Sequence, residues 1–531
     1  MKEQSNNNSL SFGEGWGEAN KQSHNNSLSF GEGWGEVFVY ISNLSLQFQK
    51  KSVFSNLNWT INLGENWVLG GISGSGKTAL AKIISAKQSA ISNVKINFKN
   101  PSNLPAQVLY VESWYQFKNI EGVANFYFQQ RYTSLQAKDT LTVSAELAHY
   151  AKEHQLAIAD VENLVNALGF SALKNSQLIE LSSGEHKKLQ LVKALWLKPQ
   201  LLIIDQPYTG LDAASRENLN VLLDEVAQKG VTLILISNDE ELPSCINCFA
   251  AIKDGKLIET EEKESIAIST EKQFRNIPSF LKEAPLYASE NIAKMIDVSI
   301  SYGDKKVLKN INWEVKAGEK WLLQGHNGSG KSTLLSLING DHPQSYANTL
   351  YLFGNKRGSG ESIWDIKQHI GLISPEFHWY FDANSTVWES VASGLYDSVG
   401  LFQQLPYSKG KQVDELIAYF SLTESKNEVL STLSMGKQRL VLLARTIIKN
   451  PELLILDEPC QGLDKQQTAE FNHLVDALSA NGMTVVYVGH FEAQLPSCLT
   501  KRIVLENGEV KTIEEITKDI KIDNYSTLVE Q

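Results

Sequence analysis

The stretch WVLGGISGSGKT at residues 67–78 is nearly repeated as WLLQGHNGSGKS at residues 321–332. Each copy is an apolar run that leads into the pattern G-x-x-x-x-G-K-[ST]. The glycines let the backbone curl so that its N–H groups point inward, at the oxygens of a phosphate. We therefore predict two phosphate-binding loops, each between a buried strand and a helix, with the helices at residues 78–88 and 332–340.

The rest of the chain repeats in the same frame. The segment at residues 53–71 parallels the segment at 307–325 with an offset of 254 residues, and LLIIDQPYTGLD at 201–212 parallels LLILDEPCQGLD at 453–464 with an offset of 252. Constant spacing over so long a stretch indicates two homologous domains. Apolar runs separated by helices favour buried parallel strands, that is, an α/β fold. We place the domains at residues 37–265 and 291–518, with a linker at 266–290 and a C-terminal tail at 519–531.

The first 36 residues belong to neither repeat. The phrase NNSLSFGEGWGE occurs at residues 7–18 and again, unchanged, at 25–36. These stretches are rich in Asn, Ser and Gly and cannot bury a core, so we expect residues 1–36 to be a disordered tail. A short binding motif, a translated DNA repeat and a misplaced start codon all remain open explanations of the duplication.

Composition limits the class of protein. A chain of 531 residues with 42% hydrophobic and 21% charged residues is typical of a soluble protein with two or more domains. No apolar run is long enough to span a bilayer and no secretory signal opens the sequence, so we expect a cytoplasmic protein, peripheral at the inner face of the cell membrane if a membrane partner recruits it. The net charge of −11 argues against broad nucleic-acid binding but leaves a local basic groove open.

Four cysteines are too few for a disulfide framework. Cys245 and Cys248 form one C-x-x-C, but no second pair or nearby His completes a zinc site, so we expect ordinary reduced cysteines.

The residue types in and after the loops indicate how a nucleotide would be held. Lys77 and Lys331 would neutralise the terminal phosphates. Asp205 and Asp457 end apolar strands, where a carboxylate reaches a metal ion, although an acidic cap is the simpler alternative. The predicted metal ligands for Mg²⁺ are Thr78, Asp205, Ser332 and Asp457. The predicted nucleotide-binding loop residues are Gly71, Ile72, Ser73, Gly74, Ser75, Gly76, Lys77 and Thr78 with Gly325, His326, Asn327, Gly328, Ser329, Gly330, Lys331 and Ser332.

Two further segments, LSSGEHKK at 181–188 and LSMGKQRL at 433–440, come shortly before the aspartate strands. A Ser and a Gly that open a helix offer a hydroxyl and backbone N–H groups to an anion. Either segment alone would read as a helix with a serine cap. Together with the loops and the aspartates they add nucleotide-binding candidates, which are Ser182, Gly184, Ser434 and Gly436.

This set of motifs, with Gly-Leu-Asp at 210–212 and 462–464, resembles the ATP-binding cassette (ABC) ATPases over nearly all of the chain after residue 36. The region 371–404 is further similar to the tandem ATPases of the molybdenum-transport and photorepair type. The resemblance implies two P-loop NTPase domains, each with a mainly parallel core sheet, an antiparallel β subdomain and a helical subdomain. It also implies intramolecular pairing of the cassettes, head to tail, with ATP between the loop of one and the Ser-Gly signature of the other.

The resemblance also suggests roles for single residues. Phe48 and Tyr302 match the aromatic that stacks on adenine, although core packing also explains an aromatic there. Glu458 matches the carboxylate that polarises the attacking water, and His490 matches the histidine that contacts the γ-phosphate, so these two are the predicted catalytic residues.

The first repeat lacks both catalytic residues. Gln206 replaces Glu458, and either Ser237 or Asn238 replaces His490. An amide does not accept a proton as a carboxylate does, and loss of a general base typically costs about 10²–10⁴-fold in rate. A Gln orients water in some P-loop GTPases, but here the His is missing as well. We expect one site that hydrolyses ATP and one that holds it.

Two regions bear on partners. The positions that usually hold a glutamine in ABC ATPases read Glu112-Ser113 and Pro375-Glu376 in this chain. This leaves open how the nucleotide state is passed to a partner. Residues 113–134 are dense in aromatics and fit either local packing or a docking surface for protein or single-stranded nucleic acid.

The sequence therefore predicts an ATPase that energises a transport system through membrane permease subunits, with molybdate suggested by the resemblance alone. The alternative is a nucleotide-dependent switch that acts on nucleic acid or ribosomes. The short linker of mixed charge weighs against that alternative, since the translation-factor cassette proteins carry a long basic one.

Overall fold

The computed structural model describes residues 37–48, 51–89, 91–96, 108–113, 140–239, 241–260, 276–285, 289–302, 305–381, 384–489 and 495–516. Several predictions lie outside these residues: the tail at 1–36, the C-terminal tail at 519–531, nearly all of the aromatic segment and the catalytic candidate His490.

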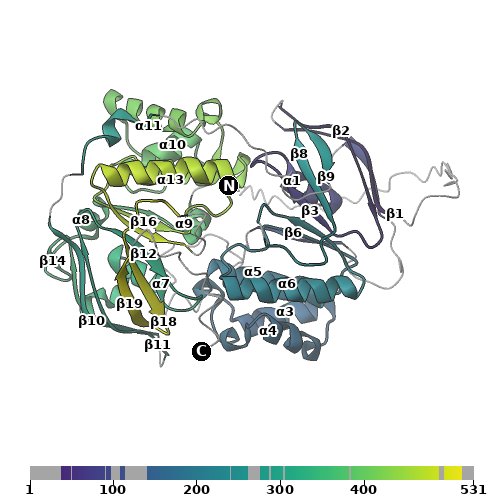
Figure 1. Ribbon diagram of the computed structural model, residues 1–531, viewed down its shortest axis with the longest axis horizontal. Coiled ribbons are helices and arrows are strands. Elements are labelled where there is room, and N and C mark those ends of the chain that lie inside the picture. The colour runs from purple at the N-terminus through teal and green to yellow at the C-terminus, as the bar shows by residue number, and fades with distance from the viewer. Residues whose placement is uncertain are drawn as a thin grey trace, which may run out of the picture.

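Two six-stranded sheets of matching topology form the cores of the two repeats (Figure 1). Their orders are β5-β6-β7-β3-β8-β9 and β15-β16-β17-β12-β18-β19. In each sheet five strands run parallel and the last is antiparallel to its neighbour. The bounds are β3 Trp67–Gly70, β5 Val108–Val111, β6 Leu201–Asp205, β7 Thr232–Ile236, β8 Cys248–Lys253, β9 Lys256–Thr260, β12 Lys320–Gln324, β15 Ile370–Ile373, β16 Leu453–Asp457, β17 Thr484–Val488, β18 Lys501–Glu506 and β19 Glu509–Glu515.

A second, antiparallel sheet accompanies each core sheet. The orders are β2-β1-β4 in the first repeat and β11-β10-β13-β14 in the second. The predicted fold class, a mainly parallel core with an antiparallel β part and helices, is therefore confirmed. The bounds are β1 Val37–Phe48, β2 Lys51–Asn62, β4 Ile91–Ile96, β10 Asn291–Tyr302, β11 Lys305–Lys316, β13 Thr349–Leu352 and β14 Asn355–Lys356.

The helix after each loop is shorter than we expected from the sequence. It ends at Ile84 in α1 and at Ile338 in α7, because Ala86 and Gly340 take up left-handed backbone with φ of 57° and 77°. The α-helices are α1 Lys77–Ile84, α3 Val143–His154, α4 Glu162–Ala167, α5 Ser183–Trp196, α6 Ala213–Gln228, α7 Lys331–Ile338, α8 Ile363–Lys367, α9 Pro375–Tyr380, α10 Val387–Ala392, α11 Tyr407–Tyr419, α12 Met435–Ile447 and α13 Lys465–Ala480.

A pair of tryptophans shows how closely the repeats agree. Trp59 and Trp67 pack edge to face with ring centroids 5.4 Å apart, and Trp313 and Trp321 do the same at 5.5 Å. The sequence repeat at an offset of 254 residues is thus also a repeat of core packing.

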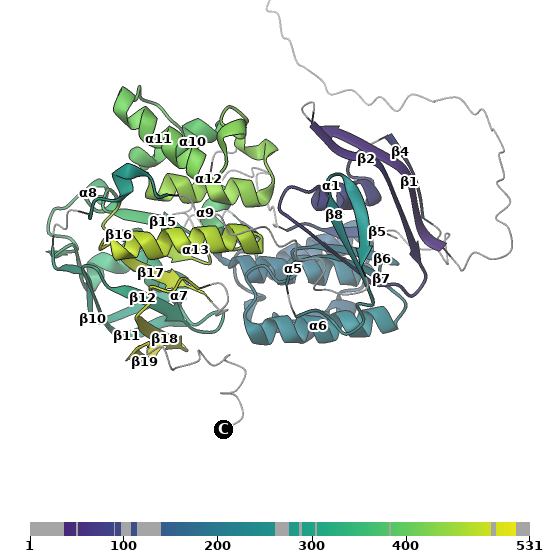
Figure 2. The same cartoon turned by 45° about the horizontal axis from the view of Figure 1, so that its top comes forward.

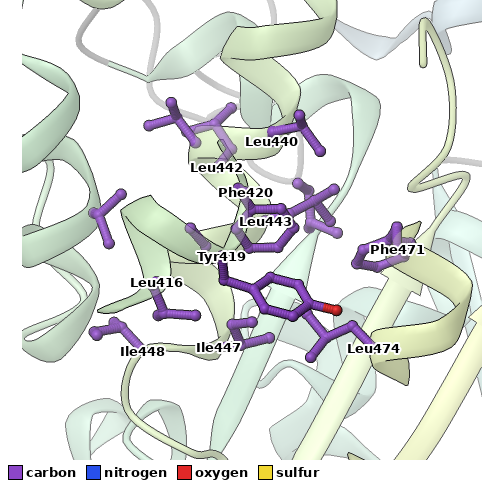
Figure 3. Close-up of a cluster of buried hydrophobic side chains, with 14 of the residues drawn as sticks. Leu416, Tyr419, Phe420, Leu440, Leu442, Leu443, Ile447, Ile448, Phe471 and Leu474 are labelled. Atoms are coloured by element: carbon purple, nitrogen blue, oxygen red, sulfur yellow. The ribbon is translucent and has the colours of Figure 1, made fainter. Parts of the chain in front are cut away.

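The helical core of the second repeat extends beyond the residues we assigned to that domain. Side chains of α11, α12 and α13 pack together in it, among them Tyr419, Leu443 and Phe471 (Figure 3). Leu281, from the predicted linker, is fully buried in this cluster. Asn481 Nδ2 donates to the Leu281 carbonyl at 3.1 Å, so this part of the linker is attached to the second repeat.

The two repeats lie side by side, with α1, α5 and α6 in one and α7, α12 and α13 in the other (Figures 1 and 2). Within the described residues, no helix combines the length and the apolar character that crossing a membrane requires.

Candidate nucleotide-binding sites

Each predicted phosphate-binding loop lies between a buried strand and a helix, β3 and α1 or β12 and α7. Gly76, at φ of 105°, could not carry a side chain, since a Cβ there would lie 2.8 Å from the ring of Phe54. Lys77 Nζ donates to the carbonyls of Gly71 at 2.7 Å and Ile72 at 2.8 Å. Burial lowers the pKa of Lys77 to about 8, while Asp205 and Asp464 oppose this shift. The loop thus surrounds its lysine with its own carbonyls.

The second loop repeats this geometry. Lys331 Nζ donates to the carbonyls of Gly325 at 2.6 Å and His326 at 3.1 Å. Burial again lowers the pKa of the lysine, against the charges of Glu458 and Asp457. A bound phosphate would favour the ammonium form of either lysine, because an opposite charge raises the pKa.

The first pair of predicted metal ligands is in contact. Thr78 Oγ1 donates to Asp205 Oδ2 at 2.7 Å, and the Tyr110 hydroxyl donates to the same oxygen at 3.1 Å. Hydroxyl and carboxylate oxygens are the hard donors that suit Mg²⁺. Asp457 ends β16 at the matching point, but Leu372 stands in the second repeat where Tyr110 stands in the first.

Contacts between the repeats bring each loop to the other repeat. Ser73 N donates to Asp464 Oδ2 at 3.1 Å, and Ser73 Oγ lies 3.5 Å from Ser434 Oγ. A Cβ at Gly436 would lie 2.2 Å from Ser73 Oγ, so a side chain there would force Ser73 to move. We call the combination of the first loop, Asp205 and the Ser434 signature the first site.

The second site combines the second loop, Asp457 and the Ser182 signature. Asn327 N donates to Asp212 Oδ2 at 2.8 Å, and Asn327 Nδ2 donates to the Gly210 carbonyl at 2.9 Å. Gly184 packs on Gly210, where a Cβ would meet the carbonyl oxygen at 2.1 Å. The two repeats therefore meet head to tail.

The two signature helices begin differently. Ser182 caps α5 and shares a reciprocal capping box with Glu185, whose carboxylate accepts from Ser182 N at 2.7 Å. Lys437 stands in the place of Glu185 on α12, so the same box cannot form there. The hydroxyl of Ser434 instead lies beside the first loop.

The residues after the strand aspartates have matching backbones. Gln206 and Glu458 both adopt left-handed conformations, with φ of 52° and 43°. Their N–H groups donate to the equivalent carbonyls of Ile236 at 3.0 Å and Val488 at 3.1 Å. The chemical difference between the turns at this position is therefore an amide in one and a carboxylate in the other.

Strand register resolves which residue of the first repeat takes the place of His490. Asp205 pairs with Ile236, as Asp457 pairs with Val488, so the residue two positions further on is Asn238. Asn238 Oδ1 accepts from Gly71 N at 3.0 Å, and its Nδ2 donates to Gly71 O at 3.2 Å. The amide is thus bonded to the start of the first loop.

The two predicted adenine-stacking residues end equivalent strands, Phe48 in β1 and Tyr302 in β10. The Tyr302 hydroxyl is hydrogen-bonded to His342 Nε2 at 2.8 Å. His342 Nδ1 accepts from Gln344 N, so a neutral ring carries its proton on Nε2 and donates to Tyr302. Burial lowers the pKa of His342 to about 4, which keeps the ring neutral.

Comparison with known proteins decides the family. The model of the family described as ABC transporter matches residues 54–209 and 308–461, more than half of the chain. The chain belongs to the ABC transporter family. It is 33% identical over 460 residues to the ABC transporter ATP-binding protein ModF of Escherichia coli, covering 84% of this chain and 92% of that protein. It is 31% identical over 471 residues to an uncharacterised ABC transporter ATP-binding protein of Schizosaccharomyces pombe, covering 86% and 96%.

Among solved structures, an ATP-binding cassette of an ABC transporter in its ADP conformation is 20% identical, covers 45% of this chain and 99% of its own, and has a TM-score of 0.39. With two matched segments in one chain, this protein is a tandem ABC ATPase, and the predicted resemblance is confirmed.

Sequence reasoning missed several residues at the two ABC sites. Tyr110 was not singled out, since its bond to Asp205 depends on the adjacency of β5 and β6. Lys187 and Arg439 lie in the two signature segments, but the motif pattern assigns no role to either residue. Their spacing from Ser182 and Ser434, five residues in each case, was the signal that a comparison of the repeats could have used.

Proposed function

We propose that this tandem ABC ATPase hydrolyses ATP at the second site and holds ATP at the first. The supporting observation is the pair of matching turns in which Glu458 carries a carboxylate and Gln206 an amide on the same backbone. Because the binding parts are present twice and the general base once, the two sites share affinity for ATP but differ in chemistry.

At the second site, the N–H groups of residues 325–332 and Lys331 would bind the β- and γ-phosphates, and the Ser182 helix would close on them from the other cassette. Ser332 and Asp457 would hold Mg²⁺, which supplies charge neutralisation when bound. Glu458 would take a proton from the attacking water. The oxygen of that water would bond to the γ-phosphorus while the bond between the γ-phosphorus and the ADP oxygen breaks. His490 would contact the γ-phosphate.

At the first site, Lys77 and the loop at 71–78 would bind the phosphates, and Thr78 and Asp205 would hold Mg²⁺. Phe48 would stack on adenine here, as Tyr302 would at the second site. Gln206 takes the place of the base. Asn238 takes the place of the histidine, and its amide, which does not titrate, is bonded to Gly71. ATP would therefore stay intact in this site and keep the cassettes associated.

The wider role we propose is to energise a transport system, in which closure and reopening of the cassettes drive membrane permease subunits. A relative named ABC transporter ATP-binding protein, matched over 92% of its length, supports this role. Such a protein would work at the inner face of the cell membrane. Molybdate is the cargo that we would test first. Capture of a membrane protein with closed, ATP-bound protein would support the transport role, whereas capture of ribosomes or nucleic acid would contradict it.

The experiment that tests which site hydrolyses ATP compares two single substitutions, one in each cassette. Glu458→Gln should lower steady-state ATPase turnover by about 10²–10⁴-fold while ATP binding persists, because the base is lost and the loop is not. Gln206→Glu should raise turnover little, because Asn238 still stands where the His is needed. If Glu458→Gln keeps more than about a tenth of the wild-type rate, the assignment of the base is wrong.

A further inference from the structure

Arg439 lies inside the second cassette and reaches the catalytic turn. The side chain is only 1% exposed. Its Nη2 donates to the carbonyls of Glu458 at 2.8 Å and Asp457 at 3.3 Å, and its Nε donates to the carbonyl of Pro459 at 3.0 Å. The guanidinium thus binds three successive carbonyls, and Glu458 is the middle residue.

The same guanidinium bridges this turn to a second segment. Arg439 Nη1 donates to the Ser374 carbonyl at 2.9 Å. Ser374 caps α9, whose Phe377 N donates to Ser374 Oγ at 3.1 Å. One buried side chain therefore connects the turn that carries Glu458 with the loop that follows β15.

The first cassette has a weaker version of this connection. Lys187 occupies the equivalent position on α5, and its Nζ donates to the carbonyls of Asp205 at 2.6 Å and Glu112 at 2.8 Å. Its bond to the turn ends on the aspartate, one residue before Gln206. Arg presents five donors in a rigid plane, whereas Lys is a compact charge on a flexible stem. The more rigid connection thus occurs in the cassette that keeps the general base.

Glu458, like Gln206, has a backbone conformation that its neighbours must hold, and Arg439 bonds to the Glu458 carbonyl, whereas Lys187 bonds to the carbonyl of Asp205. The Glu458 φ of 43° lies in the left-handed region, which residues other than glycine seldom adopt and which persists only where neighbours fix it. Its N–H is bonded to Val488, and its carbonyl accepts from Gln461 N at 3.2 Å as well as from Arg439. A displacement of about 1 Å in a catalytic group can cost on the order of 10²-fold in rate.

We propose that Arg439 is a positioning residue that fixes the backbone of Glu458 and so aims its carboxylate at the attacking water. This inference rests on the proposed role of Glu458 as the general base. Arg439 itself touches neither nucleotide nor water in the proposed reaction.

The test exchanges Arg439 for the lysine of the other cassette. Arg439→Lys in the full chain should lower kcat by roughly ten- to a hundredfold and leave KM for ATP unchanged, because the loop that binds the phosphates is untouched. The matched control is Arg445→Lys, a buried arginine further along α12 that bonds to Ser393 and Ser398. It should leave kcat unchanged.

A double variant separates positioning from general damage. In the Glu458→Gln background, single-turnover rates should be the same with and without Arg439→Lys, because the carboxylate that Arg439 aims is already gone. A further loss in that background, an equal loss of kcat in Arg445→Lys, or a wild-type kcat in Arg439→Lys would each overturn the inference. A wild-type rate in Glu458→Gln alone would instead refute the proposed function.

Discussion

The two cassettes agree at the residues that we propose bind a nucleotide and differ at the residues that we propose activate water. Both have a lysine surrounded by loop carbonyls, a strand-end aspartate and a cross-cassette contact to the loop. Matching positions that differ include Gln206 and Glu458, Asn238 and His490, Tyr110 and Leu372, and Lys187 and Arg439. Under the proposed function, binding and cleavage depend on separable residues, so a cassette can keep the first and lose the second.

The largest effect should come from the phosphate-binding lysines. Lys331→Ala should lower turnover by on the order of 100-fold or more, because it removes the main charge for the phosphates at the hydrolytic site. Turnover in Lys77→Ala should stay within about tenfold of wild type, since this substitution affects the hydrolytic site only through coupling between the two sites. Steady-state ATPase assays measure both. Equal losses of turnover in the two variants would contradict a functional difference between the cassettes.

The next effect concerns Leu281, the linker residue that packs into the core of the second cassette. Leu281→Ala should destabilise the second cassette by about 2–5 kcal/mol, because it leaves a cavity among fully buried neighbours. Scanning calorimetry should show this loss in the transition of the second cassette alone. Lys282→Ala, at the neighbouring exposed position, is the control and should melt like the wild type. A shift of the first cassette's transition would mean that the linker supports both.

A smaller effect concerns stability at low pH and the histidine that is bonded to Tyr302, the adenine-stacking candidate of the second cassette. His342 is buried with its pKa lowered to about 4, and its counterpart in the first cassette is Gln88. Between pH 6.5 and 4 the unfolded chain binds a proton that the folded chain does not, so stability is full above pH 6.5 and falls as the pH drops toward 4. His342→Gln should remove this loss of stability at low pH, which amounts to at most about 3 kcal/mol.

Denaturant unfolding at several pH values measures the contribution of His342. His378, whose pKa burial also lowers to about 4, should supply one part of the pH dependence that remains, and carboxylates whose pKa is lowered, such as Asp212 and Glu319, should add to it as the pH approaches 4. An unchanged slope in His342→Gln would show that His342 is solvated or protonated in the folded protein.

The sequence predicted the loops, the aspartates and the duplicated α/β fold because each is a local pattern with a fixed spacing. It could not choose between Ser237 and Asn238, since that choice depends on which residue of β7 pairs with Asp205. It missed Arg439, whose partner carbonyls at Ser374 and Glu458 are 65 and 19 residues away along the chain. It placed Leu281 in a linker because the segment falls between the two repeats, although Leu281 is buried in the core of the second repeat and Ile277 and Phe280 pack against the same cluster.

The retention of ATP tests the central claim most directly. The protein is loaded with labelled ATP, freed of excess, and given unlabelled ATP, and the label that stays bound is followed through many turnovers. We predict that one label per chain remains bound as ATP, since the first site has the binding parts and lacks Glu458 and His490. If all the label leaves as ADP within one or two turnovers, both sites hydrolyse and the account of unequal cassettes is wrong.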